Sequence, residues 1–240
     1  MKAAIDILIL IILVHGIWSG YKKGLIMGVA GILVFTVAVY GANLLSTAFA
    51  YDIVPALKPF ASGYVEGRID AEDGVFADLG WENEDNYSID DLLANYEDEE
   101  LDFTTACYED MGIDSASAKV MGEAALDYAR QDGVPIVDAV IHQLCQRISY
   151  VGCFVLAFLM IAIVITVVIN LPNLSYKIPH LDLVNDISGA VLGFVTAVAY
   201  VAVLVWALKF MGMIIGDSLA ESAIGGWFLE RGFLLKYLGI

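Results

Sequence analysis

Polar side chains interrupt the long apolar runs of this 240-residue chain at positions where they could line a path for an ion or a polar solute. His15 is the deepest ionisable one, and the amide and hydroxyl residues are Asn43, Asn170 and Thr196. An ionisable group at membrane depth is unfavourable, so it indicates function unless its surroundings satisfy it. Two interpretations of His15 stay open: a proton relay or polar path, and a histidine satisfied at the membrane interface.

Residue patterns of enzymes are scarce in the rest of the chain. There is no H-E-x-x-H, no G-x-S-x-G, no Walker loop and no C-x-x-C. The cysteines Cys107, Cys145 and Cys153 have unrelated spacings, although a Cys107–Cys145 bridge is an alternative if that region lies outside the cell. The sequence therefore predicts no catalytic residue and no cofactor.

The acidic clusters could collect Ca²⁺, but their spacing does not match a calcium loop. The stretch 70-DAEDGV-75 lacks glycine at the sixth loop position, so it is not an EF-hand, and a solvated run of charge is the simpler interpretation. No metal site is predicted. Nucleic acid is excluded as a partner because the chain carries a formal charge of −17.

The elements that hold these residues are predicted to be membrane helices. Hydrophobic residues make up 59% of the chain and the mean hydropathy is +0.74, both too high for an ordinary soluble domain. A helix needs about 20 apolar residues to cross about 30 Å of hydrocarbon. Four segments meet this requirement, and they are residues 3–19, 25–50, 148–171 and 188–215.

The remaining segments are predicted to lie outside the hydrocarbon. Residues 51–147 hold 23 Asp and Glu against 5 Lys and Arg, a balance of −18, so the rest of the chain carries +1. Pro55 and Pro59 open this acidic insertion, which is expected to be helical near the membrane and irregular at its tip. Residues 217–240 have the spacing of an amphipathic interfacial helix. The predicted fold is thus an all-α membrane protein with four transmembrane helices, in a hairpin (1–50) and a second pair (148–216).

Small residues recur every four positions in two of the predicted spans. In lipid, small residues let helix backbones approach closely, which gains packing energy. Contact between helices of one chain is the simpler interpretation, and a dimer face or a backbone-lined path is the alternative. The two sets are Gly16, Gly20, Gly24 and Gly28 in the first hairpin and Gly189, Gly193 and Ala197 in the last span.

The turn Gly20, Lys22, Lys23 and Gly24 sets the predicted orientation. Lysines in short loops favour the cytoplasm, whereas long acidic segments are translocated largely regardless of their charge. The turn is therefore expected inside, with both termini and the acidic insertion outside.

Two blocks of the sequence resemble the colicin V production (CvpA) family of small bacterial inner-membrane proteins. The first is 5-IDILILIILVHGIWSGYKKGLIMGVAGILVFTVAVYGANLLS-46, in which Lys23, Gly24 and Leu25 stand where the family has an RGF-like element. The second is 182-DLVNDISGAVLGFVTAVAYVAVLVWAL-208, followed by a serine, Ser222. The acidic insertion departs from the family, since many relatives have a much shorter loop there.

The resemblance implies a multi-pass protein of the bacterial inner membrane, associated with toxin production or export or with envelope maintenance. It implies no catalytic residue. The expected partners are the lipid bilayer and either a second copy of the chain or envelope and secretion proteins. The alternative is a small oligomeric transporter or channel, with His15, Asn43, Asn170 and Thr196 lining its path.

Overall fold

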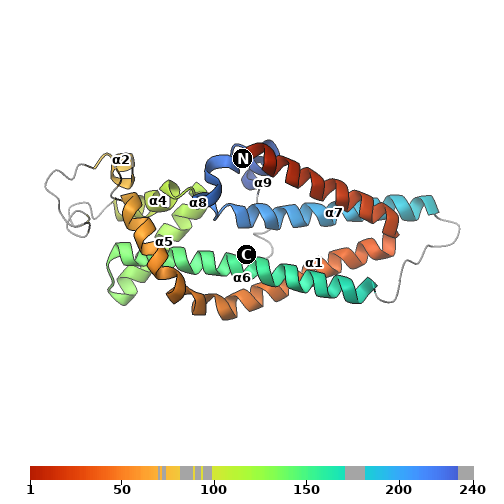
Figure 1. Cartoon of the computed structure of the whole chain (residues 1–240), viewed down its shortest axis with the longest axis horizontal. Coiled ribbons are helices and arrows are strands. Elements are labelled where there is room, and N and C mark those ends of the chain that lie inside the picture. The colour runs from red at the N-terminus through yellow and green to blue at the C-terminus, as the bar shows by residue number, and fades with distance from the viewer. Residues whose placement is uncertain are drawn as a thin grey trace. The chain divides into compact units, whose positions relative to one another are not determined.

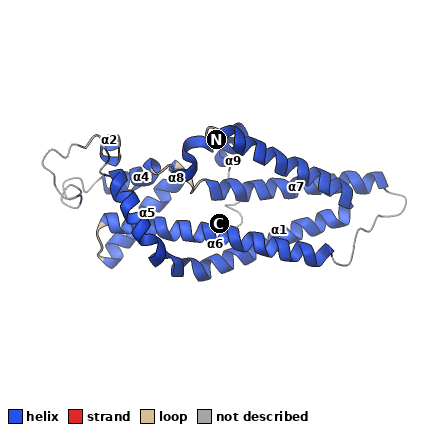
Figure 2. Cartoon of the chain, in the orientation of Figure 1, coloured by secondary structure: helices blue, strands red, loops and turns tan. Residues whose placement is uncertain are grey.

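The structure is a computed structural model that describes residues 1–69, 71, 74–81, 89, 93, 99–170 and 182–231. Within these residues every regular element is a helix and there is no strand (Figures 1 and 2). The elements are α1 (Lys2–Ile69), α2 (Val75–Leu79), α4 (Glu100–Asp110), α5 (Ser115–Asp132), α6 (Ile136–Asn170), α7 (Asp182–Leu208), α8 (Gly212–Ile215), the 3₁₀ helix η2 (Gly216–Ser218) and α9 (Ala223–Glu230).

Three of the described helices, α1, α6 and α7, are long and apolar enough to cross a membrane. Many of their large apolar side chains face outward, among them Leu156, Met160 and Ile163 on α6, each more than 60% exposed. In water such a surface would be unfavourable, whereas in lipid it is the expected exterior. The chain is therefore a multi-pass membrane protein with an all-helical fold.

Helix α1 is broken at Gly24, which has φ 77° and ψ −175°. This backbone conformation is left-handed in φ and is open to glycine but strained for other residues. The break divides α1 into a first arm, residues 2–23, and a second arm, residues 25–69, and the chain reverses its direction at the break (Figure 1). The predicted spans 3–19 and 25–50 fall one on each arm.

The second arm continues past its predicted end at residue 50 and runs through Pro55 and Pro59. The helix thus extends into the part of the insertion that was expected to be helical near the membrane. A proline in a helix removes the hydrogen bond to the carbonyl four residues earlier. Because the two prolines are themselves four apart, Pro59 removes the bond to the carbonyl of Pro55, and the loss stays on one side of the helix.

The helices that hold the other two predicted spans have bounds of their own. Helix α6 begins at Ile136, in the part of the insertion that was expected to be helical near the membrane, and it ends at Asn170. Helix α7 runs from Asp182 to Leu208, so it ends before residue 215, the predicted end of the last span. Beyond Leu208 the chain forms the short helix α8, and Gly212 at its start packs directly against the backbone of Gly112.

The described chain forms two compact units, and residues 1–48, 152–209 and 217–240 make up the first. Aromatic rings tie its long helices together. Phe35 of α1 lies edge-on to Phe158 of α6 and to Tyr200 of α7, with ring centroids 5.8 and 5.3 Å apart. Phe154 meets Trp206 in the same way at 5.0 Å. Edge-to-face pairs of this kind add about 0.5–1.5 kcal/mol each to the packing of apolar surface.

Residues 49–151 and 210–216 make up the second unit, which contains the predicted acidic insertion. Its core holds Phe103, Tyr108 and Met111, each no more than 1% exposed. The phenol of Tyr108 donates a hydrogen bond to the carbonyl of Val140 at 3.0 Å, so its one polar atom is satisfied. The alternative bridge between Cys107 and Cys145 is not formed; both are free thiols. Burial raises the pKa of Cys107, which keeps it protonated and unreactive.

A buried ion pair fixes the end of the second arm of α1 within this unit. The guanidinium of Arg68 donates to both carboxylate oxygens of Asp110, at 2.6 and 2.5 Å, and the Asp110 side chain is only 5% exposed. Breaking such a pair would leave a buried charge without a partner.

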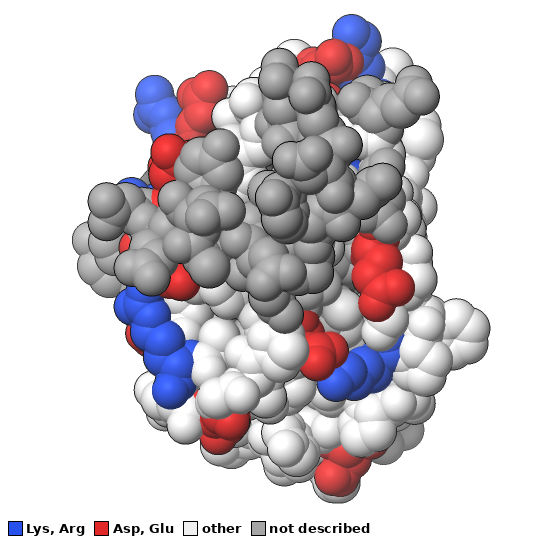
Figure 3. Space-filling model, turned by 90° about the vertical axis from the view of Figure 1, so that its left-hand side faces the viewer, with Lys and Arg blue, Asp and Glu red and all other residues white. Residues whose placement is uncertain are grey.

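On the one face of the molecule drawn in Figure 3, the described acidic side chains do not gather into a single patch. Ten of the 23 acidic residues between 51 and 147 lie outside the described residues. On the face of the molecule drawn in Figure 3, the described carboxylates are spread among basic and uncharged side chains.

Candidate functional site

The first arm of α1 packs against α7 with the two backbones in direct contact. A Cβ atom added to Gly20 would overlap the carbonyl oxygen of Gly189 and lie 2.9 Å from the Cα of Gly193. The reverse also holds, because a Cβ on Gly193 would lie 2.9 Å from the Cα of Gly20. Side chains larger than hydrogen therefore do not fit where these helices cross. The two sets of small residues singled out in the sequence therefore face each other.

The same contact continues along both helices. At one end, a Cβ on Gly16 would overlap the Cβ of Ala197. Beyond the break, a Cβ on Gly28 would lie 2.8 Å from the Cβ of Leu192. The contact thus joins α7 to both arms of α1.

Asn185 of α7 holds the break itself. Its side chain is 2% exposed, and its Oδ1 accepts a hydrogen bond of 3.0 Å from the backbone N–H of Leu25. Leu25 is the first residue of the second arm, so this N–H has no partner within its own helix. Asn185 supplies the missing acceptor, as an N-cap residue would. A Cβ on Gly24 would lie 2.8 Å from the Asn185 Cγ. A residue other than glycine at position 24 would therefore collide with the Asn185 side chain that caps the second arm.

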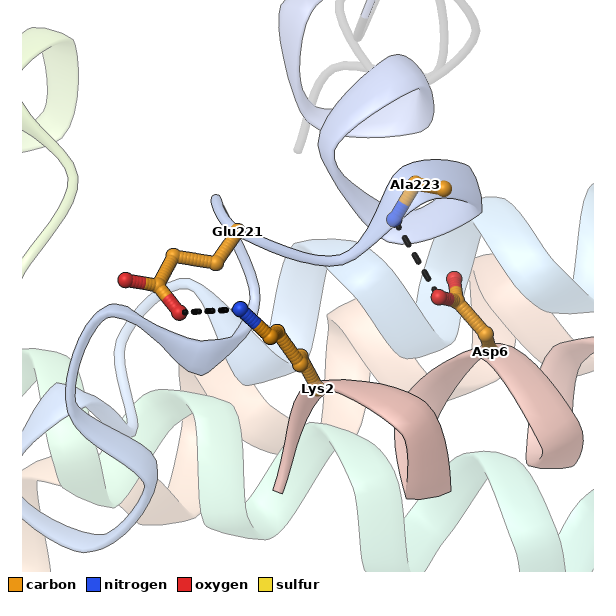
Figure 4. Close-up of polar contacts among 4 residues, drawn as sticks. All are labelled: Lys2, Asp6, Glu221 and Ala223. Carbon is orange, nitrogen blue, oxygen red and sulfur yellow. Dashed lines mark hydrogen bonds and ion pairs between the residues drawn. The ribbon is translucent and has the colours of Figure 1, made fainter.

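A second helix start is capped from a distance in the same way. The carboxylate of Asp6 on α1 accepts a hydrogen bond of 3.2 Å from the N–H of Ala223 (Figure 4). It accepts a second one, of 2.8 Å, from the N–H of Ile224. Ser222 precedes α9 in the N-cap position, but its hydroxyl makes no capping bond. The carboxylate of Asp6 caps α9 instead of the Ser222 hydroxyl. Its negative charge also interacts favourably with the partial positive charge at the N-terminus of α9. We call Asp6 and the first turn of α9 the terminal clasp.

Lys2 and Glu221 form an ion pair beside the clasp, with Nζ and Oε2 3.4 Å apart (Figure 4). Both side chains are about 60% exposed. Exposed pairs of this kind contribute about 0–1 kcal/mol, so Asp6 carries more of the attachment than Lys2 does.

The lysines of the turn lie in the last turn of the first arm. Lys22 and Lys23 are both exposed, and the ammonium of Lys22 lies 4.8 Å from the centre of the Trp18 ring. Cations are favourable at the C-terminal end of a helix because the carbonyl groups there carry partial negative charge.

His15 and Asn43 lie on different arms of α1. His15 is exposed on the first arm, nine residues before the break, and Asn43 is half-buried on the second arm, nineteen residues after it.

Thr196 and Asn170 complete the predicted polar set. The hydroxyl of Thr196 donates to the carbonyl of Leu192 in its own helix at 2.8 Å. The backbone of Asn170 ends α6, and its side chain lies outside the described residues. Among the described residues, no three His, Cys, Asp or Glu side chains gather in a way that could hold a metal ion.

Sequence reasoning missed both capping side chains as site residues, although one of them carried a signal. Asn185 lies four residues before Gly189 and so extends the row of small residues in α7 by one turn. A polar residue at the end of such a row indicates a hydrogen bond to the neighbouring helix. No comparable pattern links Asp6 to α9, because 217 residues separate Asp6 from Ala223. What this arrangement can do is hold helices in place, since its polar groups are occupied by backbone.

We predict that Asp6→Ala releases the first turn of α9. Removing a capping side chain costs about 1 kcal/mol, with a range of about 0.5–2. Amide hydrogen exchange at Ala223 and Ile224 should therefore become roughly fivefold to tenfold faster, as measured by exchange with fragment mass spectrometry. Lys2→Gln is the matched control, and it should leave these amides nearly unchanged. Equal exchange in the wild type and in Asp6→Ala would show that the clasp does not hold α9.

Comparisons of the chain with protein-family profiles, with curated proteins and with solved structures found no match.

Proposed function

We propose that this chain is a four-span protein of the bacterial inner membrane, of the CvpA type, with a non-enzymatic role in toxin production or export or in envelope maintenance. In this account the four spans are the two arms of α1, together with α6 and α7. Its contacts, rather than a reacting group, carry out its function.

The observation that carries the proposal is the capped break at Gly24. A single span would have no need of a glycine in a left-handed conformation, or of a buried asparagine from another helix to satisfy the next N–H. A hairpin of two spans needs both. The first arm has 22 residues, which is about 33 Å of helix and enough to cross the hydrocarbon.

The glycine contact and the two caps support a role as a scaffold. Each of these polar groups is satisfied by the backbone of another helix, so each holds position and none is left to bind a substrate. Within the second unit, helices α4 and α5 pack against each other, and both contribute buried side chains to its core. This unit is the part of the chain that we propose meets an envelope or secretion protein.

The proposed orientation places Lys22 and Lys23 in the cytoplasm, with both termini and the acidic unit outside. It follows from the preference of lysines in short loops for the cytoplasmic side.

The topology is tested with single cysteines in a variant whose three native cysteines are replaced. A membrane-impermeant maleimide applied to intact spheroplasts should label Lys2→Cys and Lys119→Cys. It should label Tyr21→Cys and Asp182→Cys only after lysis. All four positions are exposed, so each should react once it is reached. If Lys2→Cys and Lys119→Cys are labelled from opposite sides of the membrane, the four-span count is refuted. If Tyr21→Cys and Asp182→Cys are labelled in intact spheroplasts and the other two only after lysis, the orientation is refuted.

The role is tested in cells that lack the chain, by uptake of an impermeant dye and by the amount of toxin exported. The wild type should restore whichever property is lost, and so should His15→Ala and Asn43→Ala, because a scaffold does not use these side chains. Immunoblots of membrane fractions give the level of each variant. Failure of either variant at normal membrane levels would contradict the scaffold and support the transporter alternative.

A further inference from the structure

The first arm of α1 has an outer face that combines an apolar stripe with a cationic end. The stripe is formed by Ile7, Ile11, Val14, Trp18 and Tyr21, which are 57, 59, 63, 58 and 46% exposed. Their spacing of three and four residues places them along one side of the helix. We call these five residues the outer stripe. It leads directly to Lys22 and Lys23.

Both lysines at the end of the stripe are open to an outside ligand. Each is exposed, and among the described residues neither forms an ion pair with a carboxylate. The Trp18 ring holds the Lys22 ammonium at 4.8 Å, which limits its motion. The end of the helix contributes about half a negative charge, which two ammonium groups outweigh. The charges that this end of the first arm itself carries therefore sum to a positive value.

We propose that the outer stripe and the two lysines bind one anionic phospholipid, with its acyl chain along the stripe and its phosphate at the ammonium groups of Lys22 and Lys23. This inference rests on the proposed membrane insertion of the first arm. Trp and Tyr prefer the level of the lipid headgroups, so Trp18 and Tyr21 mark the depth at which a phosphate is expected. Lysines close to such a surface attract anionic lipids.

A free phosphate or an acidic protein would match the lysines alone. Neither would account for an apolar stripe that continues for four helical turns away from the charge. A phospholipid has a charged phosphate at one end and an apolar acyl chain at the other. The first arm has its lysines and its apolar stripe in the same order. The charge of the site and the length of its apolar part therefore favour a lipid as the ligand.

The test uses the full-length protein purified in detergent with an equimolar mixture of phosphatidylglycerol and phosphatidylcholine. Native mass spectrometry measures how much of each lipid the protein retains. The wild type should retain phosphatidylglycerol preferentially, and Lys22→Gln/Lys23→Gln should lower that preference by about tenfold or more, because each lysine near a phosphate contributes a factor of about five. Lys22→Arg/Lys23→Arg should keep it.

The matched control is Arg231→Gln. Arg231 lies 5.0 Å from the centre of the ring of Trp227, four residues earlier in sequence, so this pair reproduces the spacing of Trp18 and Lys22 at the end of α9 instead of the first arm. Arg231→Gln should keep the preference. Undiminished preference in the double glutamine variant, equal loss in Arg231→Gln, or complete displacement of the lipid by inorganic phosphate would each overturn the proposal. Circular dichroism confirms that every variant is folded. Orientation does not enter a detergent experiment, so this result and the topology result can fail separately.

Discussion

The direct contact of the α1 and α7 backbones is the constraint on which the rest of the membrane unit depends. Apolar side chains gain little by leaving lipid for the protein interior, so packing and hydrogen bonds must hold the spans together. Gly20, Gly189 and Gly193 allow the main chains to touch, and a single added methyl group would collide with backbone that cannot move aside. Close contact over several turns gives many small dispersion gains, which sum to a substantial stabilisation.

The break in α1 follows from this contact. The first arm lies along α7 up to Gly24, where Asn185 of α7 receives the N–H of Leu25 and so sets the start of the second arm. One helix therefore determines both the line that the first arm follows and the point at which the chain reverses. The terminal clasp does the same for α9, because a carboxylate on α1 determines where that helix begins. In both cases a side chain distant in sequence replaces a local cap.

Local patterns in the sequence were sufficient to predict the helices and the glycine sets. Runs of Leu, Ile and Val identify apolar helices, and a spacing of four places small residues on one face. The pairing of Gly20 with Gly189 could not be predicted in this way, because it joins segments about 170 residues apart. The same reason hid the role of Asp6. Helix ends were predicted less well: the second arm of α1 continues past residue 50 and through Pro55, and α7 ends at Leu208, before the predicted end at residue 215.

The position of Gly16 against Ala197 offers the most direct test of the helix contact. Gly16→Ala should lower the free energy of unfolding in detergent by about 1–3 kcal/mol, since the new methyl group overlaps the Cβ of Ala197. The double variant Gly16→Ala/Ala197→Gly has a methyl group on α1 but none at position 197 of α7. It should therefore recover part of the lost free energy of unfolding. The carbonyl of Gly193, 2.8 Å from the new Cβ, limits the recovery. A double variant no more stable than Gly16→Ala would contradict the contact between α1 and α7.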